Sequence, residues 1–400
     1  MGFKFQRKVL DNGMTIIFEK RNLPVVAVAF AVKQGGINET EEEKGISHFI
    51  EHLIYKGTPT RNTKKIAEEI EGNGGELNGF TSETLTAYWC KMPSTHLNLA
   101  LTVLSDIVKN PIFDKNDIEK EREVIFEEIK MHRDTPRTYV FEGIQKNLFE
   151  KPFGEPVIGT LSTLKSLDKQ KITEKFNQTY QPNKMILGVV GDADFDEIVK
   201  FAEKNFGKKQ GKITSSKIKT KTGTQIEVRK GIDQANLIFA YHTPLAGDKK
   251  SYASQILITL MAGGMSSRLF DEIRVKRNLA YSVKGDSDIH KDYSSSYIYV
   301  GTMKKNVEIV KELILEEFEK VAKDLTEKEL KRIKEQIIGN YHISMEDSQN
   351  QLVNLLIFEI NGNAEDYYDF EKNILDVKLK DVKELAKIKD YSFFALVPEN

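Results

Sequence analysis

The stretch from which the fold and the chemistry of this chain are best inferred reads His48-Phe49-Ile50-Glu51-His52. An α-helix completes a turn in about 3.6 residues, so side chains four positions apart lie on the same face. Both imidazoles can therefore reach one metal ion, and Glu51 points to the same side, where it can contact a water molecule. The order H-x-x-E-H reverses the commoner H-E-x-x-H, and it likewise indicates a catalytic zinc site on a helix.

The flanking residues predict an amphipathic helix around this motif. Apolar side chains recur at the spacing of one helix face, at Ile46, Phe49, Ile50, Leu53 and Ile54. The opposite face carries the two histidines, Glu51 and Tyr55, and Gly57 and Pro59 predict that the helix ends soon after. A solvated face that carries histidines by coincidence is the alternative, but only seven His occur in the chain and two of them sit at ligand spacing around a Glu.

The composition is that of an ordinary globular protein with a sizeable core. Of the 400 residues, 40% are hydrophobic and 30% are charged. This length predicts roughly two to three domains. The net charge of −1 gives no electrostatic support for binding nucleic acid or an anionic membrane surface, so neither is expected as a partner.

Cysteine usage and hydropathy bear on the compartment. Cys90 is the only cysteine, which excludes an intrachain disulfide and a Cys-rich zinc site. The first residues, Met1 to Arg7, have no apolar segment of the kind found in secretory signals. No apolar run reaches the roughly 18 residues of a membrane span. A cytoplasmic protein is therefore the expectation.

The chain contains two halves of similar plan, in which strands are followed by helices. The first half is expected to contain strands at 24–33, 76–80, 85–92 and 184–191, and helices around His48 and at 62–72, 94–109 and 114–133. The second half is expected to contain strands at 225–229, 236–242, 280–289 and 295–301, and helices at 251–261, 267–276, 304–324 and from 327 onward. The predicted fold class is α+β, with two homologous units that each pack a mostly antiparallel sheet against helices.

A linker is predicted between the two halves. The segment 207–224 is rich in Lys, Gly, Ser and Thr and has little apolar content. The predicted domains are therefore 1–206, with the zinc helix, and 225–400. The helix at 251–261, which corresponds to the zinc helix, contains no His, so a duplicated fold with one active half is the simplest interpretation.

The helix at 114–133 offers a third metal ligand, which a catalytic zinc site usually needs. A stripe at spacings of three and four contains Ile118, Glu121, Ile125, Glu128 and His132. Acids on a buried stripe are costly unless partnered, so we favour Glu128 as the ligand and Glu121 as a group that orients a ligand histidine. Packing against basic residues would explain both acids equally well, and spacing alone does not exclude Glu127 or His132.

The sequence resembles the pitrilysin-like, or inverzincin, zinc peptidases, and in particular the small members of about 400 residues that are similar to mitochondrial processing peptidase. The resemblance spans the whole chain. It rests on four segments in order: 45–53 with the H-x-x-E-H motif, 74–81, 121–124 leading to Glu128, and 267–274 followed by 279–281. One such motif would be weak support, but four on the expected elements are strong support.

The resemblance implies roles for the residues of the first half. His48 and His52 match the zinc imidazoles, and Glu128 matches the distal carboxylate ligand of a single Zn²⁺ per chain. Glu51 matches the general base, and Glu121 matches the acid that supports the catalytic site. The physical argument agrees, because zinc lowers the pKa of a bound water towards ~7 and a nearby carboxylate can then accept its proton.

The resemblance also implies residues that bind substrate. Asn78, Gly79 and Phe80 match an edge strand that pairs with extended peptide, which would permit loose sequence preference. Many relatives have Ala at the position of Gly79, and this replacement is conservative for backbone pairing. Arg274 and Tyr281 match a pair in the second half that reaches the substrate near the zinc.

The expected function is that of a zinc-dependent endopeptidase that hydrolyses peptides or unfolded segments bound in a closed chamber. Because one chain carries both the complete zinc motif and the Arg/Tyr pair, a homodimer is expected, without a different partner subunit. A non-catalytic scaffold or partner subunit of a peptidase complex is the alternative, and a zinc hydrolase acting on other substrates is a third interpretation.

Overall fold

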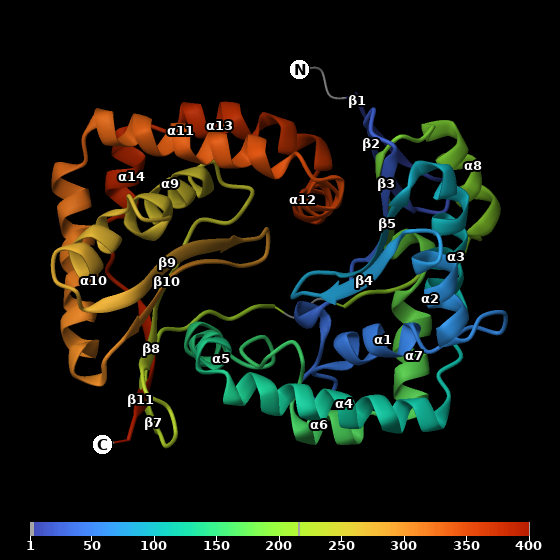
Figure 1. Ribbon diagram of the computed structural model, residues 1–400, viewed down its shortest axis with the longest axis horizontal. Coiled ribbons are helices and arrows are strands. Elements are labelled where there is room, and N and C mark those ends of the chain that lie inside the picture. Colours follow the sequence, from blue (N-terminus) through green and yellow to red (C-terminus); the bar gives the residue numbers. More distant parts are fainter. Residues whose placement is uncertain (1–3, 215–216, 400) are drawn as a thin grey trace. The chain divides into compact units, whose positions relative to one another are not determined.

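The computed structural model describes residues 4–214 and 217–399, and these form two compact units (Figure 1). Unit 1 comprises Met1–Ile129, Glu155–Lys217 and Ser344–Tyr367, and unit 2 comprises Lys130–Gly154, Ile218–Ile343 and Tyr368–Asn400, each in its described part. Each unit contains one β-sheet packed against helices, which confirms the predicted α+β class. Within the described ranges, no helix is long and apolar enough to cross a membrane.

The sheet of unit 1 has six strands in the order β1-β2-β6-β3-β5-β4. The strands are β1 (Lys4–Val9), β2 (Thr15–Lys20), β3 (Val25–Val32), β4 (Glu76–Thr81), β5 (Thr86–Pro93) and β6 (Met185–Gly191). Among the described residues of this sheet only β2 and β6 pair in parallel, so the sheet is mostly antiparallel, as predicted. Strand β4 lies at the edge, where β5 is its single neighbour in the part of the chain that the structure describes.

Helices cover both faces of this sheet. They are α1 (Ile46–Ile54), α2 (Thr63–Glu71), α3 (Leu97–Lys109), α4 (Lys115–Asp134, in unit 1 as far as Ile129), α6 (Leu161–Ser166), α7 (Lys169–Thr179), α8 (Phe195–Asn205) and α12 (Ser348–Asn361). Val26, Val28 and Val32 of the central strand β3 belong to the core that α3 closes, whereas the alanines of β3 alternate with them and face the other way. On that second face Gly188 leaves room for α12, since a Cβ there would lie 2.5 Å from Leu352 Cδ1.

The sheet of unit 2 has five strands in the order β7-β11-β8-β10-β9. The strands are β7 (Thr224–Arg229), β8 (Ala235–His242), β9 (Ala280–Ile289), β10 (Ser294–Thr302) and β11 (Ser392–Pro398). Its helices are α5 (Pro136–Leu148), α9 (Ser251–Ala262), α10 (Val307–Asp324), α11 (Glu327–Ser344), α13 (Phe370–Asp376) and α14 (Leu379–Leu385). A π-helical turn at Phe270–Val275 lies within the predicted helix at 267–276.

The two sheets follow the same plan, in agreement with the predicted duplication. In each, one parallel pair (β2 with β6, β7 with β11) continues into an antiparallel series that ends at an edge strand, β4 or β9. A helix from the other half of the sequence covers a face of each sheet: α12 packs on β3 and β6, and α5 packs on β8 and β11. The compact units therefore exchange the segments 130–154 and 344–367.

The division of the sequence into domains stays a prediction, with domains at 1–206 and 225–400 and a linker at 207–224. Compact units defined by contacts need not coincide with duplicated sequence domains. Residues 1–3, 215–216 and 400 of those ranges lie outside the described residues.

Candidate metal centre

Helix α1 is fixed at its first turn by a buried acid. Gly45 precedes the helix with a φ of 95°, and a Cβ there would lie only 2.7 Å from the Ile158 carbonyl oxygen, so the chain needs glycine at this point. The Glu39 carboxylate accepts hydrogen bonds from Gly45 N (3.0 Å) and Ser47 N (2.8 Å). A carboxylate at a helix N-terminus satisfies backbone donors and complements the helix dipole. The apolar face of α1 is buried, as its spacing predicts.

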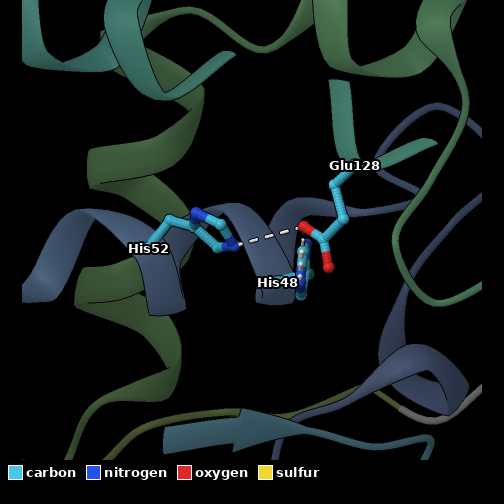
Figure 2. A group of neighbouring side chains, drawn as sticks. All are labelled: His48, His52 and Glu128. Carbon is cyan, nitrogen blue, oxygen red and sulfur yellow. Dashed lines mark ion pairs between the residues drawn. The ribbon is translucent and has the colours of Figure 1, made fainter. Parts of the chain in front are cut away.

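Three of the predicted site residues come together in unit 1 (Figure 2). The Glu128 carboxylate, on α4, points toward both rings of α1: its Oε2 lies 3.8 Å from His48 Nε2 and 3.6 Å from His52 Nε2. The potential ligand atoms of the three side chains all lie within 4.8 Å of one another. The side chains of His48, His52 and Glu128 are 13%, 22% and 28% exposed, so all three are accessible to solvent.

Glu121 lies behind His52, where an orienting acid is expected. His52 Nδ1 donates to Glu121 Oε2 at 3.1 Å, which directs Nε2 toward Glu128. Lys56 Nζ lies 2.5 Å from the other oxygen, Oε1. Burial alone would raise the pKa of Glu121, but the hydrogen bonds from His52 and Lys56 outweigh it and lower that pKa. Glu121 therefore stays ionised and fixes the tautomer of His52.

His52 is strongly basic when no metal is bound. Burial lowers its pKa, but the hydrogen bonds with Glu121 and Glu128 and the charges of Glu128 and Glu51 outweigh burial and raise the pKa to about 9. The proton on Nε2 occupies the position that a metal would take.

We expect zinc uptake to displace this proton. Calorimetry at about pH 7.5, below the raised pKa of His52, should give a binding enthalpy that changes with the ionisation enthalpy of the buffer. Because the pKa of His52 is raised in the folded state, protonation of His52 stabilises the metal-free fold. This stabilisation is complete below the ordinary histidine pKa near 6.5, and it is lost as the pH rises through about 9. In Glu121→Gln the pKa of His52 should fall and proton release should shrink. A buffer-independent enthalpy in the wild type would contradict this interpretation.

Glu51 lies beside the three potential ligands, next to the edge strand. Thr81, the last residue of β4, donates its hydroxyl to Glu51 Oε2 at 2.6 Å. Burial raises the pKa of Glu51, and the charge of Glu128 adds to this increase. The Thr81 hydrogen bond and the charge of His52 oppose it, but the pKa of Glu51 remains raised. A raised carboxyl pKa favours proton transfer near neutral pH.

The two alternative ligands lie outside this group. Glu127 is exposed on the solvated side of α4. His132 lies in the last turn of α4, in the part that belongs to unit 2, and its Nδ1 donates to Glu142 Oε1 at 3.0 Å. Packing of Glu121 and Glu128 against basic residues is the alternative to a metal site, and Glu121 does contact a basic residue, Lys56.

Four of the predicted substrate residues lie on edge strands, and the fifth, Arg274, lies in the π-helical turn Phe270–Val275. Asn78, Gly79 and Phe80 are on β4, and the Asn78 carboxamide oxygen accepts from Gly79 N at 2.8 Å. In unit 2, the guanidinium of Arg274 lies over the ring of Tyr281, 4.8 Å from its centroid, and Tyr281 is 77% exposed at the start of β9. These two side chains help to line an open cavity of about 480 Å³ in unit 2.

Sequence reasoning missed four residues around the site. They are Glu39, which caps α1, Lys56, which pairs with Glu121, Thr81, which bonds Glu51, and Tyr55, whose hydroxyl approaches Gly79. Thr81 belongs to the segment 74–81 that carries the family resemblance, and Tyr55 belongs to the polar face of the predicted zinc helix. Nothing in the sequence indicated that Glu39 or Lys56 would reach the site, because both contacts depend on how loops pack.

Comparison with known proteins agrees with this geometry. Residues 15–161 match the family model described as insulinase (peptidase family M16), and residues 166–337 match the model described as the peptidase M16 inactive domain. An uncharacterized zinc protease of Rickettsia felis is 34% identical over 86% of this chain and 84% of its own length. The uncharacterized zinc protease YmxG of Bacillus subtilis is 33% identical over 87% of this chain and 86% of its own length.

A solved structure supports the fold. The crystal structure of a protease from Helicobacter pylori superposes with a TM-score of 0.91 at 22% identity, covering 99% of this chain and 100% of that one. The segment that matches the insulinase model includes the H-x-x-E-H helix and Glu128. The segment that matches the inactive-domain model covers most of the second half of the chain, which has no H-x-x-E-H motif. The extent of these matches, with identities above 30% over most of both chains, means that this protein belongs to the insulinase (M16) peptidase family.

Proposed function

We propose that this chain is a zinc-dependent endopeptidase that binds one Zn²⁺ through His48, His52 and Glu128. The observation that carries the proposal is the convergence of two imidazole nitrogens and a carboxylate oxygen within 4.8 Å, with Glu51 adjacent in sequence to one ligand. Two histidines and a carboxylate are a common ligand set of catalytic zinc, which leaves a position open for water or substrate. The names of the two related zinc proteases support the same metal.

The residues present fit a zinc ion. The His52 ring is held by Glu121 at Nδ1, so that Nε2 is directed toward Glu128 and is available as a ligand. An anionic ligand and nearby Glu51 complement the charge of a dication. When bound, Zn²⁺ would lower the pKa of a water molecule towards ~7 and polarise a peptide carbonyl.

In this mechanism Glu51 transfers the protons. Its carboxylate accepts a proton from the attacking water and later donates that proton to the leaving amine of the cleaved peptide bond. Thr81 holds one carboxylate oxygen, which limits the rotation of the group while the proton moves. Glu121 does not touch the reacting atoms, because it acts through His52 and is therefore a positioning residue.

Peptide is the proposed substrate class. Strand β4 is an edge strand that ends at Thr81, next to Glu51, so an extended peptide paired along Asn78, Gly79 and Phe80 would bring a scissile bond toward the base. Backbone pairing would select unfolded segments with little sequence preference. We further propose that Arg274 and Tyr281 bind substrate carbonyls, and that two copies of the chain form a homodimer enclosing a chamber.

Replacement of the Arg/Tyr pair tests the substrate-binding part of the proposal. Arg274→Ala should raise KM about tenfold, the value of one charge-assisted hydrogen bond, while zinc content stays unchanged. Arg277→Ala is the matched control, because Arg277 pairs with Glu272 on the same segment. Steady-state kinetics with an unstructured peptide would measure both. Equal KM values in wild type and Arg274→Ala would remove Arg274 from the substrate site.

The function itself is tested with a quenched fluorescent peptide library. The zinc-loaded wild type should hydrolyse unstructured peptides, lose this activity to a chelator and regain it when zinc is restored. Light scattering on the same sample should give the mass of a dimer. Stoichiometric zinc with no hydrolysis of any peptide would instead favour the scaffold or partner-subunit alternative.

A further inference from the structure

A buried hydroxyl lies next to Glu51 without a hydrogen-bond partner. Tyr55 follows α1 directly, four residues after Glu51 and on the same face. Its ring packs edge-on against Tyr88, with 5.9 Å between the centroids. The hydroxyl oxygen is inaccessible to solvent, and no donor or acceptor among the described residues bonds it. A buried polar atom without a partner is costly, so its retention calls for an explanation.

Gly79 creates the space into which this hydroxyl points. A Cβ added to Gly79 would lie 2.5 Å from Tyr55 Oη and 3.4 Å from Glu51 Oε1. Both oxygens are therefore neighbours of one small volume, which any other residue at position 79 would fill. The other oxygen of Glu51, Oε2, already accepts the Thr81 hydroxyl. Position 79 is thus coupled to Tyr55 and to the proposed base.

We propose that Tyr55 is a positioning residue for Glu51: its hydroxyl donates to Oε1, directly or through one water, when a substrate is bound, and Gly79 is needed for this contact. This inference rests on the proposed peptidase function. Burial, together with the charge of Glu51 and the neighbouring Tyr180, raises the pKa of Tyr55 well above its ordinary value, so the hydroxyl keeps its proton and can donate it to a carboxylate oxygen.

Two donors would then hold the carboxylate, Thr81 on Oε2 and Tyr55 on Oε1. A carboxylate oxygen can accept two hydrogen bonds, so Oε1 would keep a position for the attacking water. Such a clamp fixes the base in a reactive geometry before the proton moves. The competing partner is the carbonyl oxygen of Ala87, which lies 3.0 Å from the same added Cβ. A hydroxyl bonded there would support the strand and leave the reaction unaffected.

A double-mutant cycle distinguishes these roles. Tyr55→Phe removes only the hydroxyl group of Tyr55, and Gly79→Ala fills the space that this hydroxyl occupies. Each should lower kcat about tenfold or more, as expected for a hydrogen bond to a charged group, with KM and zinc content within about twofold of wild type. The double variant should be no slower than either single one, because the hydroxyl can be lost only once. Tyr241→Phe, at a buried tyrosine of unit 2, is the control and should keep the wild-type kcat.

The outcomes separate this inference from the proposed function. Wild-type protein that hydrolyses no peptide would overturn both. Wild-type hydrolysis with an unchanged kcat in Tyr55→Phe, or strictly additive losses in the double variant, would overturn the role of Tyr55 alone. If Gly79→Ala does not fold, the comparison of Tyr55→Phe with wild type and Tyr241→Phe still decides the question. Loss of zinc in Tyr55→Phe would also count against a role confined to Glu51.

Discussion

The variant Glu51→Gln should lose peptide hydrolysis by about two to four orders of magnitude, the usual contribution of a general acid–base group. The amide keeps the shape of the side chain and can still contact Thr81, but it cannot accept a proton from water. Its zinc content should equal that of wild type, because Glu51 does not belong to the three side chains whose ligand atoms converge. Initial rates with a quenched peptide, normalised to zinc content, measure the effect.

The control for this variant is Glu68→Gln, which makes the same chemical change on the exposed face of α2. It should leave both rate and zinc content unchanged. Equal activity in wild type and Glu51→Gln would exclude Glu51 as the base. Loss of zinc together with activity would instead indicate that Glu51 helps to hold the metal.

The variant Glu128→Gln should bind zinc at least about a hundredfold more weakly, because even groups outside the direct ligands often change metal affinity by 10–100-fold. The amide removes the anionic oxygen that lies 3.6 Å from His52 Nε2 and 3.8 Å from His48 Nε2. Zinc retained after dialysis against a competing chelator would give the loss of affinity directly.

Glu127→Gln is the matched control, since it makes the same change one residue away on the exposed side of α4. It should retain zinc as wild type does. The opposite order, with more zinc lost from Glu127→Gln than from Glu128→Gln, would show that the ligand had been assigned to the wrong acid.

Local patterns were sufficient to predict the elements that carry the site. The apolar spacing from Ile46 to Ile54 predicted a helix around the motif, and α1 spans Ile46–Ile54. The stripe on α4 favoured Glu128 as the distal ligand, but spacing alone did not exclude Glu127 or His132. That choice depends on which turn of α4 faces α1, and this is a matter of tertiary packing that no local pattern contains.

Long-range pairing set the limit of prediction. The parallel pair β2–β6 joins Thr15 to Ile186, and β11, which completes the second sheet, comes from the very end of the described chain. The exchange of α5 and α12 between the two units is also invisible to periodicity, because an amphipathic helix does not specify which sheet it covers.

Gly79 illustrates the same limit at the scale of one atom. From the sequence, glycine in place of alanine was a conservative change in an edge strand. The structure shows that the missing methyl group leaves room for the hydroxyl of Tyr55 beside Glu51. The effect of this missing methyl group depends on a contact between the end of α1 and strand β4, which are separated in sequence.

Locating the metal ion decides whether His48, His52 and Glu128 hold a catalytic zinc. Anomalous diffraction from crystals of the zinc-loaded protein, collected on both sides of the zinc absorption edge, tests this most directly. We expect one strong anomalous peak per chain, within ligand distance, roughly 2.0–2.2 Å, of both histidine Nε2 atoms and of a Glu128 oxygen. A zinc peak bound by other residues in a protein that hydrolyses peptides would contradict this expectation.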